Sequence, residues 1–595
     1  MLIYTAIILF FVVYQENSCI SYNLSDFYKN NDTLSCMIIR YSLILYQCII
    51  LCSFILTIIA AYIVISTKTK NPYYSIVPKP SRSNVLIFIP VYSENKQEIN
   101  NTIESVLLND YPIDSKIMYI VVDGIKQGAH NDDFTSNYIK DILGVNNNIS
   151  EHQDFELYLG EYKYVKYILV IKHKNKGKKD SFLFVNKTLY YNNYIDQPHS
   201  IHNNNNSSVS LTSLVSNNSS NCSRITIDID TNEKEFFESI SLKISNLLCN
   251  LNIIDYVLML DTDTKVDPSG LRLLVDHLDS NPFSAAVCGE TSVINKLDNL
   301  LTMSQMFEYY ITHYTLKALE NVYGNVLVLS GCFALYRKHI LINKKIIKMY
   351  QKESNVTLYS ANISQLGEDR LLTNLILRIY PDFNTCYIQD AKCYTVVPSD
   401  LKTLLCQRRR WTNSLIFCHI MLLLNTPNYN ILKKLRFICI LLFELVLVIF
   451  MPLLIAIGYY YTFKSIKYYI LTQELFIIIQ SLIFLLIPVI LCIILKKLSM
   501  IKYALTFILY LPFYSIFIPL YSIYFMDDVS WGETRKTNNT QIQQPIIQTP
   551  QPIQIPQNSY NSLHNFNTNY PQVPAYYNQN KNYENESIIE EYFQF

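Results

Sequence analysis

The sequence predicts an α/β domain inserted between N-terminal and C-terminal transmembrane helices, and three observations lead to this fold class. The chain has 595 residues, which is too many for one hydrophobic core. Hydrophobic residues make up 50% of it and charged residues only 16%, a composition that indicates membrane segments. Between two apolar ends, short apolar runs alternate with helix-like segments, which is typical of a parallel sheet covered by helices.

Residues 1–70 are expected to hold the first membrane segment or segments. Residues 37–65 are long enough to cross a hydrocarbon layer of about 30 Å as a helix, and Lys68 and Lys70 follow them. Because basic residues prefer the cytoplasmic flank, the chain after this helix is expected inside the cell and the chain before it outside. Residues 2–14 fit a further span and a signal peptide equally well.

Residues 83–400 are expected to form the α/β domain. Four nearly continuous apolar runs predict parallel strands that are buried on both faces, at 85–90, 117–122, 167–171 and 256–260. Ligands of such sheets bind at the carboxyl ends of the strands. Residues 203–223 are a low-complexity Asn/Ser tract with too little apolar surface to fold, so they are expected to be a surface insertion.

The C-terminal part returns to the membrane. Residues 401–430 hold an apolar stretch that is too short to span and is expected at the bilayer interface. Residues 431–526 are expected to form transmembrane helices, with apolar stretches of spanning length at 437–463, 470–495 and 503–525. A motif region at 527–536 precedes a tail, 537–595, that is rich in Asn, Gln, Pro and Tyr and is expected to be disordered.

Charge and cysteine content argue against nucleic-acid binding, a zinc site and a disulfide framework. Lys and Arg number 49 against 48 for Asp and Glu, so the formal net charge is +1 and no basic field exists to attract nucleic acid. The 14 cysteines include no CxxC pair, which argues against a zinc site and against a disulfide framework. No nucleic acid is therefore expected as a partner.

Two carboxylates follow the fourth predicted strand. Asp261 and Asp263 are two residues apart, which places both side chains on one side if the strand geometry continues through them. Hard oxygen ligands of this kind suit Mg²⁺ or Mn²⁺, whose remaining positions are filled by water and by substrate phosphates. The alternative is an acidic turn after a strand, and the pair alone does not decide between the two.

Further polar residues follow the other predicted strands. Glu94 and Asp123 come after the first and second runs, and a cluster with Lys178 and Asp180 follows the third. Lysines beside a flexible glycine can meet a diphosphate, and a carboxylate can hold a ribose or a base edge. Each residue taken singly also fits a solvated loop charge.

A series of motifs resembles a known family. The strings, in chain order, are VCGETSVINK, QMFEYYITHY, LKALENVYGNVLVLSGCFALYRK, GEDR, QRRRW and DDVSWGETR. Their order and spacing resemble those of chitin synthases, which are processive family-2 glycosyltransferases, and in particular the subgroup with an SWGxTR motif. The resemblance covers residues 85–535 and implies that the α/β domain is a GT-A-like nucleotide-sugar transferase.

The resemblance implies a full activity. It implies an inverting enzyme that transfers N-acetylglucosamine from UDP-GlcNAc to the non-reducing end of a growing β-1,4-linked chitin chain, and that passes the chain across the lipid bilayer. It implies a Mg²⁺ or Mn²⁺ cofactor, a cytosolic catalytic domain, and a place in the plasma membrane, with intracellular vesicles and a homodimer left open. A synthase of another β-linked polymer, such as cellulose or hyaluronan, and a non-catalytic membrane scaffold are the rival readings.

The metal and the general base have candidates among the acidic residues. A metal at Asp263, with Asp261 orienting the metal or the ribose, would neutralise the departing phosphate. The acceptor hydroxyl must lose its proton, which calls for a carboxylate base, and Asp369 in GEDR is the candidate, flanked by Glu368 and Arg370. The alternative for the two acids is helix N-terminal carboxylates stabilised by the helix dipole.

The last two motifs are expected to bind the acceptor and the diphosphate. In QRRRW, Gln407, Arg408 and Arg410 would face the diphosphate and Trp411 would offer a stacking surface to the sugar. In the SWGETR motif the corresponding candidates are Trp531, Thr534 and Arg535. The alternative for the arginines is a positive-inside membrane anchor.

Two features strain the resemblance. Ser330 stands where the family usually has proline before the glycine of the VLSGCF loop, which leaves the stiffness of that loop in doubt. Three full spans after Trp411 would place the SWGETR motif on the outer face. If that motif completes a cytosolic site, one apolar stretch must be re-entrant or interfacial, and 503–525, with Pro512 and Pro519, is the expected exception.

Overall fold

The computed structural model describes residues 83–128, 131–145, 154–195, 233–352, 357–472 and 486–530. Several predictions lie outside these residues: the N-terminal membrane segments at 1–70, the insertion at 203–223 and the tail at 537–595. The same holds for Trp531, Thr534 and Arg535. These stay predictions.

Nine strands of the described chain form one sheet, in the order β3-β4-β2-β1-β5-β8-β7-β9-β6. Their bounds are β1 Asn84–Val91, β2 Lys116–Asp123, β3 Phe155–Tyr162, β4 Val165–Lys172, β5 Ile254–Leu260, β6 Lys265–Val266, β7 Ser284–Val293, β8 Phe333–Arg337 and β9 Asn384–Thr395. The four apolar runs of the sequence are β1, β2, β4 and β5, and they pair in parallel as predicted.

The sheet is mixed, because the strands added at both sides mostly run the other way. β3 pairs antiparallel with β4, and β8 pairs antiparallel with both β5 and β7, whereas β7 and β9 are parallel. The β3–β4 hairpin turns through Lys163 and Tyr164, both with positive φ. Such turns usually carry Asn or Gly, so the sequence gives no signal for this hairpin.

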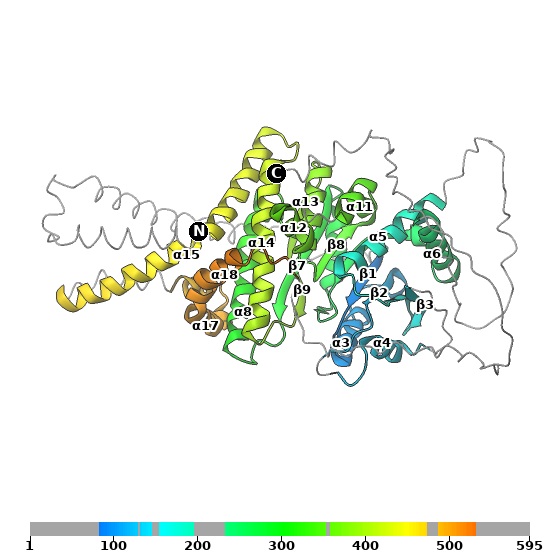
Figure 1. The fold of residues 1–595 in the computed structure, drawn as a ribbon, viewed down its shortest axis with the longest axis horizontal. Helices are drawn as coiled ribbons and strands as arrows, with labels where there is room; N and C mark the ends of the chain where they lie inside the picture. The colour runs from blue at the N-terminus through cyan, green and yellow to red at the C-terminus, as the bar shows by residue number, and fades with distance from the viewer. Residues whose placement is uncertain are drawn as a thin grey trace, which may run out of the picture. The chain divides into compact units, whose positions relative to one another are not determined.

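Helices cover the sheet and connect its strands (Figure 1). Those of the α/β part are α3 Lys96–Leu107, α4 Thr135–Leu143, α5 Lys178–Ile195, α6 Glu233–Leu247, α7 Gly270–Ser280, α8 Leu300–Ile311, the π-helical η6 Thr312–Lys317, α9 Ala318–Tyr323, α10 Lys338–Leu341, α11 Lys344–Gln351, α12 Leu358–Gln365 and α13 Glu368–Ile379, with 3₁₀ turns at Ile113–Ser115 and Leu251–Ile253. A capping box at Asn95 and Glu98 sets the start of α3.

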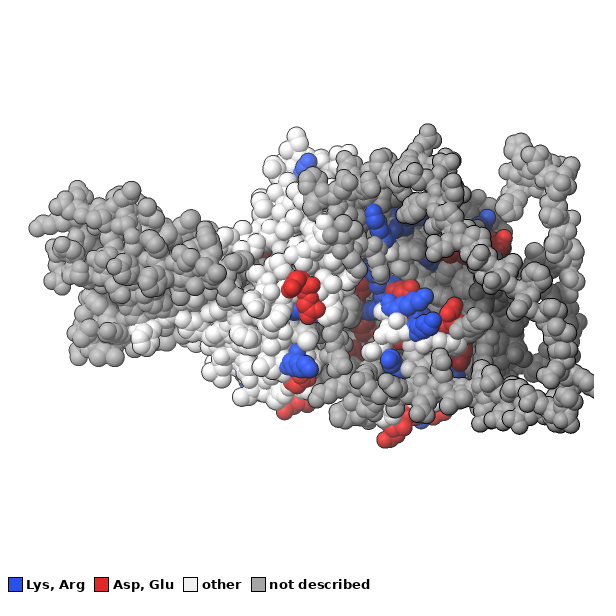
Figure 2. All heavy atoms as spheres, in the orientation of Figure 1, with Lys and Arg blue, Asp and Glu red and all other residues white. Residues whose placement is uncertain are grey.

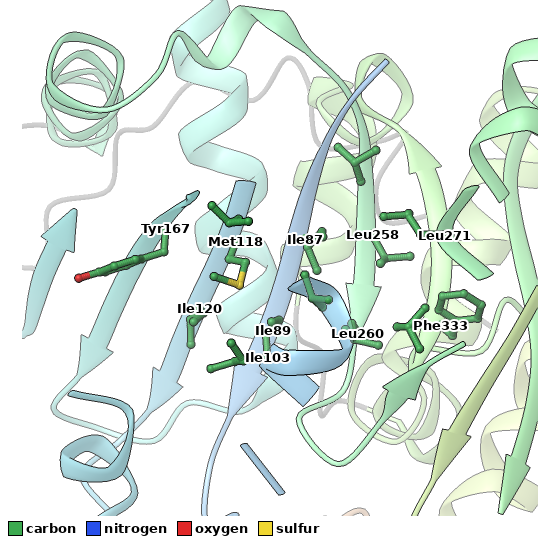
Figure 3. Close-up of a cluster of buried hydrophobic side chains, with 14 of the residues drawn as sticks. Ile87, Ile89, Ile103, Met118, Ile120, Tyr167, Leu258, Leu260, Leu271 and Phe333 are labelled. Carbon is green, nitrogen blue, oxygen red and sulfur yellow. The ribbon is translucent and has the colours of Figure 1, made fainter. Parts of the chain in front are cut away.

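The main core lies on one face of the sheet. Buried side chains of the parallel strands pack there against α3 and α7, as Figure 3 shows for Ile87, Ile89, Ile103, Met118, Ile120, Tyr167, Leu258, Leu260, Leu271 and Phe333. Each fully buried aliphatic side chain contributes about 1.5–3 kcal/mol. This packing fixes the strand ends from which the candidate site residues extend.

Further elements follow the α/β part. They include α14 Leu401–Leu424, α15 Ile431–Thr472, η7 Leu498–Met500, α17 Ile501–Pro512, the π-helical η8 Phe513–Phe517 and α18 Ile518–Tyr524, and residues 486–494 are helical as well. QRRRW lies inside α14, and α15 is one continuous helix of 42 residues that includes Pro452. The predicted interfacial stretch 414–424 is therefore the second half of a longer helix.

Within the described chain, one helix, Leu498–Tyr524, is long and apolar enough by length and composition to cross a membrane. Its first turns pack on the α/β part, because Met500, Tyr503 and Ala504 share a buried cluster with Val293 and Phe307. On the face seen in Figure 2, charged side chains gather over the sheet, beside a broad surface with few charges over α8, α14 and α18.

Candidate active site

The carboxyl end of β5 carries the first acidic pair. Leu260 ends the strand, and the amide of Thr264 donates a hydrogen bond of 3.0 Å to the carbonyl of Asp261, which closes a turn. Strand geometry therefore does not continue through Asp261 and Asp263, so the condition under which the sequence placed both side chains on one side is not met. The side chain of Thr262 ties this turn to β1 by donating to the carbonyl of Pro90.

Lys178, the first residue of α5, joins three separate segments at this strand end. Its Nζ lies 2.5 Å from Asp261 Oδ1 and 3.6 Å from Glu368 Oε1. It also donates a hydrogen bond of 3.2 Å to the carbonyl of Gly331, in the loop before β8. One ammonium group thus links the DxD turn, the GEDR motif and the VLSGCF loop.

The charges of this group are strongly coupled. Burial alone would lower the pKa of Lys178, but the carboxylates of Asp261, Glu368 and Asp369 outweigh it and raise the pKa. Burial raises the pKa of Asp261 to about 6; Lys178 opposes this shift and Asp263 adds to it. The two DxD carboxylates therefore repel each other, and Lys178 offsets part of the repulsion.

GEDR lies at the beginning of α13. The helix starts at Glu368, so Glu368 and Asp369 both lie in its first turn, where the helix dipole favours negative charge. Asp369 Oδ1 accepts the amide of Arg370 at 2.8 Å, and Oδ2 accepts the amide of Gly331 at 3.4 Å. The carboxylate is thus held in one orientation, and both sequence readings of this motif remain compatible with the structure.

Asp263 is held by two hydroxyls. Its Oδ1 accepts hydrogen bonds from Thr395 Oγ1 at 3.2 Å, at the end of β9, and from Thr264 Oγ1 at 3.3 Å. No group of three or more His, Cys, Asp or Glu side chains suited to a metal occurs in the described residues. The donor set nevertheless fits Mg²⁺ or Mn²⁺, because two repelling carboxylates suffice where water and substrate phosphates supply the other ligands.

Two predicted substrate-binding residues belong to a buried ion-pair network. Lys172 Nζ lies 2.7 Å from Asp123 Oδ1 and 2.8 Å from Asp180 Oδ2. Asp123 also accepts the amide of Lys176 at 3.0 Å, which fixes the loop before α5. This network positions the start of α5 and hence Lys178.

Glu94 interacts with its own loop. Its Oε2 accepts the amide of Tyr92 at 2.7 Å, and its carbonyl accepts the side chain of Asn131 at 3.1 Å. These contacts connect the loop after β1 with the segment before α4.

The first arginine of QRRRW links α14 to α8. Arg408 makes a two-pronged ion pair with Glu308, with Nε–Oε1 and Nη2–Oε2 distances of 3.0 and 2.7 Å. Its guanidinium lies 4.1 Å from the ring centre of Trp411, and Gln407 Oε1 accepts from its Nη1 at 2.6 Å. Tyr309 completes the group, with its ring 6.2 Å from that of Trp411.

The ring of Tyr309, in the aromatic group with Trp411, is within electrostatic reach of the acidic residues. Burial raises the pKa of Tyr309, and the charge of Asp263 is among the smaller contributions to the same shift. Trp411 is 37% exposed, so one face remains accessible. Trp411 is thus partly exposed and lies beside Tyr309, which is within electrostatic reach of Asp263.

The other two arginines are buried in different surroundings. Burial lowers the pKa of Arg410, and Glu368 and Asp369 oppose this shift, which places the guanidinium near GEDR. Arg409 forms an ion pair with Asp528 and donates a hydrogen bond to the carbonyl of Ser530 at 2.5 Å. QRRRW therefore lies within electrostatic reach of GEDR and contacts the start of the DDVSWGETR motif.

The structure brings together most of the predicted site. Lys178, Asp261, Glu368 and Asp369 form one group, with Asp263 and Arg410 within electrostatic reach. Arg370 instead lies near His419 of α14. Burial makes the largest contribution to the lowered pKa of His419, and the charge of Arg370 lowers it further. Asp123, Asp180 and Glu94 support neighbouring loops.

Sequence reasoning missed Lys172, Glu308, Arg409 and Lys317. Each is a single charged residue in a motif or strand whose pattern gives no sign of its partner. Glu308 and Lys317 lie inside two of the motifs that resemble the family, QMFEYYITHY and LKALENVYG. Their position in these motifs was the one indication in the sequence that they contribute to the site. The partner of Glu308, Arg408, lies 100 residues away in the sequence, whereas Lys317 bonds to an irregular segment eleven and thirteen residues ahead.

Comparison with known proteins agrees with the order of the motifs. A family model described as chitin synthase matches residues 57–562. The chain belongs to the chitin synthase family. This confirms the resemblance drawn from the six motifs, and the matched range includes every predicted site residue.

Curated chitin synthases align with the chain over part of their length. Chitin synthase 6 of Mycosarcoma maydis is 30% identical over 424 residues, which are 65% of this chain and 32% of that protein. Chitin synthase A of Aspergillus oryzae is 29% identical over 442 residues, or 68% and 23% of the two chains. The chain thus spans less than a third of the length of these relatives.

Solved structures with a similar arrangement include two glycosyltransferases. The mannosyltransferase from Pyrobaculum calidifontis, in complex with GDP-Man and Mn²⁺, is 12% identical with a TM-score of 0.39, covering 78% of this chain and 97% of that one. S. aureus TarS 1–349, in complex with UDP-GlcNAc, is 12% identical with a TM-score of 0.29, covering 61% and 72%. Likenesses at these TM-scores carry no inference about this chain.

Proposed function

We propose that this chain is an inverting, processive chitin synthase with a GT-A-like catalytic domain, which extends a β-1,4-linked chain from UDP-GlcNAc. The observation that carries the proposal is the meeting of four motif segments at Lys178. The ammonium contacts the DxD turn, the GEDR motif and the VLSGCF loop, and its own motif opens α5. Membership of the chitin synthase family supports the donor and the polymer.

The transfer needs one proton acceptor. A hydroxyl oxygen of the growing chain attacks C1 of the donor sugar, the bond from C1 to the phosphate oxygen breaks, and UDP departs with the electron pair. Asp369 takes the hydroxyl proton, because its carboxylate is fixed by two amide donors and retains further lone pairs. A single displacement inverts the anomeric centre.

The departing diphosphate needs positive charge. Asp261 and Asp263 would hold the divalent cation, Mg²⁺ or Mn²⁺, which supplies charge neutralisation to the phosphates when it is bound. Lys178 and Arg410 add positive charge from the protein at the same place. Lys178 is already paired with Asp261, so donor binding would share this ammonium between carboxylate and phosphate.

The acceptor sugar would stack on the aromatic group of QRRRW. Trp411 is partly exposed and is held by the guanidinium of Arg408, which Glu308 fixes in turn. A flat aromatic face beside the proposed base is the surface that a sugar ring can stack on.

The proposed topology keeps the site on one side of the membrane. Arg409 of α14 contacts Asp528 and Ser530, so the start of the DDVSWGETR motif lies on the same side as QRRRW. The chain from α15 to Asp528 must then cross the bilayer an even number of times. We assign Leu498–Tyr524 to the interface, because it packs on α/β residues at its beginning and leads into Asp528 at its end.

The decisive experiment is polymer synthesis by the purified full chain. Labelled UDP-GlcNAc with Mn²⁺ should yield insoluble product that a chitinase degrades, whereas UDP-glucose and UDP-glucuronate should yield none. Polymer from either of these donors would point to another synthase. Absence of product from all three donors, with the protein folded, would favour the scaffold.

A glycosylation experiment tests the topology. The sequence has acceptor sites at Asn23, Asn31 and Asn538, each followed two residues later by Ser or Thr. With the catalytic domain in the cytosol, expression in a eukaryotic host should leave Asn538 without a glycan and permit glycans at the first two sites. A glycan at Asn538 would overturn the proposed topology.

A further inference from the structure

Residues 325–331, which we call the strap, connect α9 to β8 and pass directly beside Asp369. Side chains and neighbouring backbone hold them in place without a strand or helix. The amide of Val326 donates to the carbonyl of Thr385 at 3.0 Å, and that of Leu327 donates to Glu320 Oε2 at 2.7 Å. The position of the strap is therefore set by its partners.

The end of the strap touches the proposed base and its helix. The amide of Leu329 donates to Thr373 Oγ1 at 3.2 Å, and Thr373 Oγ1 donates to the carbonyl of Asp369 at 2.8 Å. The amide of Gly331 donates to Asp369 Oδ2, and its carbonyl accepts from Lys178. A displacement of the strap would therefore move Asp369 and Lys178 relative to each other.

The space at Gly331 leaves little freedom. A Cβ atom at this position would lie 3.2 Å from Lys178 Nζ and 3.4 Å from the Cβ of Asp369. The backbone of Gly331 thus packs closely against both catalytic side chains. Small shifts at the preceding residue, Ser330, would be transmitted directly to them.

Lys317 is a buried ammonium group that the proposed chemistry does not use. It lies at the end of η6 and is 3% exposed. Its Nζ donates to the carbonyl of Val328 at 2.9 Å and to Ser330 Oγ at 2.8 Å, with a longer contact of 3.6 Å to Cys288 Sγ. Its charge also acts on the buried carboxylate of Glu320: burial raises the pKa of Glu320, and Lys317 opposes this shift.

A buried ammonium is costly unless its hydrogen bonds are made. An apolar side chain of similar length would fill this space without that cost, so packing alone does not account for a lysine. Besides its charge beside Glu320, the ammonium adds two directed hydrogen bonds, and both end on the strap. Glu320, three residues later, holds the beginning of the strap through Leu327, so a single helical turn clamps the strap at both ends.

We propose that Lys317 is a positioning residue for glycosyl transfer: through Val328 and the Ser330 hydroxyl it fixes the strap, and the strap holds Asp369 and Lys178 in their working arrangement. This rests on the proposed function. It also answers the question of loop stiffness, because the Ser330 hydroxyl is held by an ammonium group at the place where the resemblance expects proline.

The test is a double-mutant cycle in the full-length protein reconstituted in lipid nanodiscs. The variants are Lys317→Met, Ser330→Ala and the double variant, with kcat and KM measured for UDP-GlcNAc. We expect Lys317→Met to lower kcat by about 10–100-fold, since small misplacements of reacting groups cost up to about 100-fold. KM should change little, because Lys317 does not touch the donor.

The hydroxyl of Ser330 should act only through the ammonium. Ser330→Ala should therefore lower kcat by a smaller factor, and the double variant should be no worse than Lys317→Met alone. The matched control is Lys338→Met, which removes a partly buried lysine whose Nζ donates to two carbonyls, those of Leu251 and Asn252, away from the site. It should lower thermal stability but leave kcat almost unchanged.

Hydrogen exchange gives a readout that does not depend on activity. Lys317→Met should speed exchange of the Leu329 and Gly331 amides, and Lys338→Met should not. If wild-type protein makes no polymer, the proposed function fails. Hydrogen exchange then still tests whether Lys317 holds the strap in place. The inference is overturned by unchanged exchange in the strap, by equal kcat losses in the two lysine variants, or by independent effects of Lys317→Met and Ser330→Ala. If Lys317→Met does not fold, Ser330→Ala alone decides, through exchange at Gly331.

Discussion

The ammonium of Lys178 lies 2.5 Å from Asp261, which joins the start of α5 to the end of β5 across 83 residues of sequence. Burial raises the pKa of Asp261 to about 6 and Lys178 opposes this shift, while burial lowers the pKa of Lys178 but the surrounding carboxylates outweigh it. The pair therefore lies at the centre of the charged groups of the site, and a substrate bound there must interact with both charges.

Removing Lys178 should disable the site. Lys178→Met leaves Asp261 and Glu368 without their cation, and breaking a buried pair costs about 3 kcal/mol. We expect kcat/KM for UDP-GlcNAc to fall by about 100-fold, measured by polymer formation. Lys179→Met is the matched control, because Lys179 donates to the carbonyl of Ser364 and lies over the ring of Tyr350. Similar losses in both variants would contradict a specific role of Lys178.

Asp369 should be needed for chemistry more than for binding. Asp369→Asn keeps the shape of the side chain but cannot accept the acceptor proton, so kcat should fall by about 100- to 10,000-fold. Binding of UDP, measured by calorimetry, should change by much less. Asp382→Asn, an exposed acid of the loop after α13, is the control. Full activity of Asp369→Asn would require another base.

Asp263 should govern the requirement for the divalent cation. Chelation should stop polymer formation, and Asp263→Asn should raise the half-saturating Mn²⁺ concentration steeply. Thr395→Val removes a hydrogen bond to the carboxylate and should raise it by about 10-fold, as is usual for groups that orient ligands. Asp267→Asn, next to the same turn, serves as control. A metal dependence unchanged in Asp263→Asn would move the metal elsewhere.

The sequence predicted the parts of the fold that local pattern determines. The four apolar runs are strands because they are buried on both faces, and the first acids of GEDR lie at a helix N-terminus. The remaining strands were missed because their pairing depends on distant partners. β8, for example, inserts between β5 and β7 although it is only five residues long.

The candidate site was predictable to the same extent. Lys178, Asp261, Glu368 and Asp369 stood in motifs, and the structure brings them together. Lys172 looked like a strand residue, and only the fold reveals that it neutralises Asp123 and Asp180. Lys317 likewise has partners eleven and thirteen residues ahead in an irregular segment, which no periodicity can indicate.

Acid should destabilise the α/β domain through His277. Burial, and to a lesser degree Arg337, lower the pKa of His277 from 6.5 to about 4. Between these values the unfolded state binds a proton that the folded state does not, so stability falls as the pH falls, by about 2 kcal/mol at pH 5. His277→Gln should therefore reduce the loss of thermal stability between pH 7 and pH 5. An equal loss in His277→Gln and wild type would contradict this assignment.

The contact between Arg409 and Asp528 should hold the last motif at the site. Arg409 is 3% exposed, so Asp528→Asn leaves a buried guanidinium whose remaining partner is Ser530. We expect activity to fall by about 10-fold, the effect of roughly 1.4 kcal/mol, and trypsin to cleave faster after Arg535. The control is Asp527→Asn, at the exposed neighbouring acid, which should leave both unchanged. If the two variants behave alike, the ion pair does not anchor the motif, and the proposed position of Leu498–Tyr524 at the interface loses its main support.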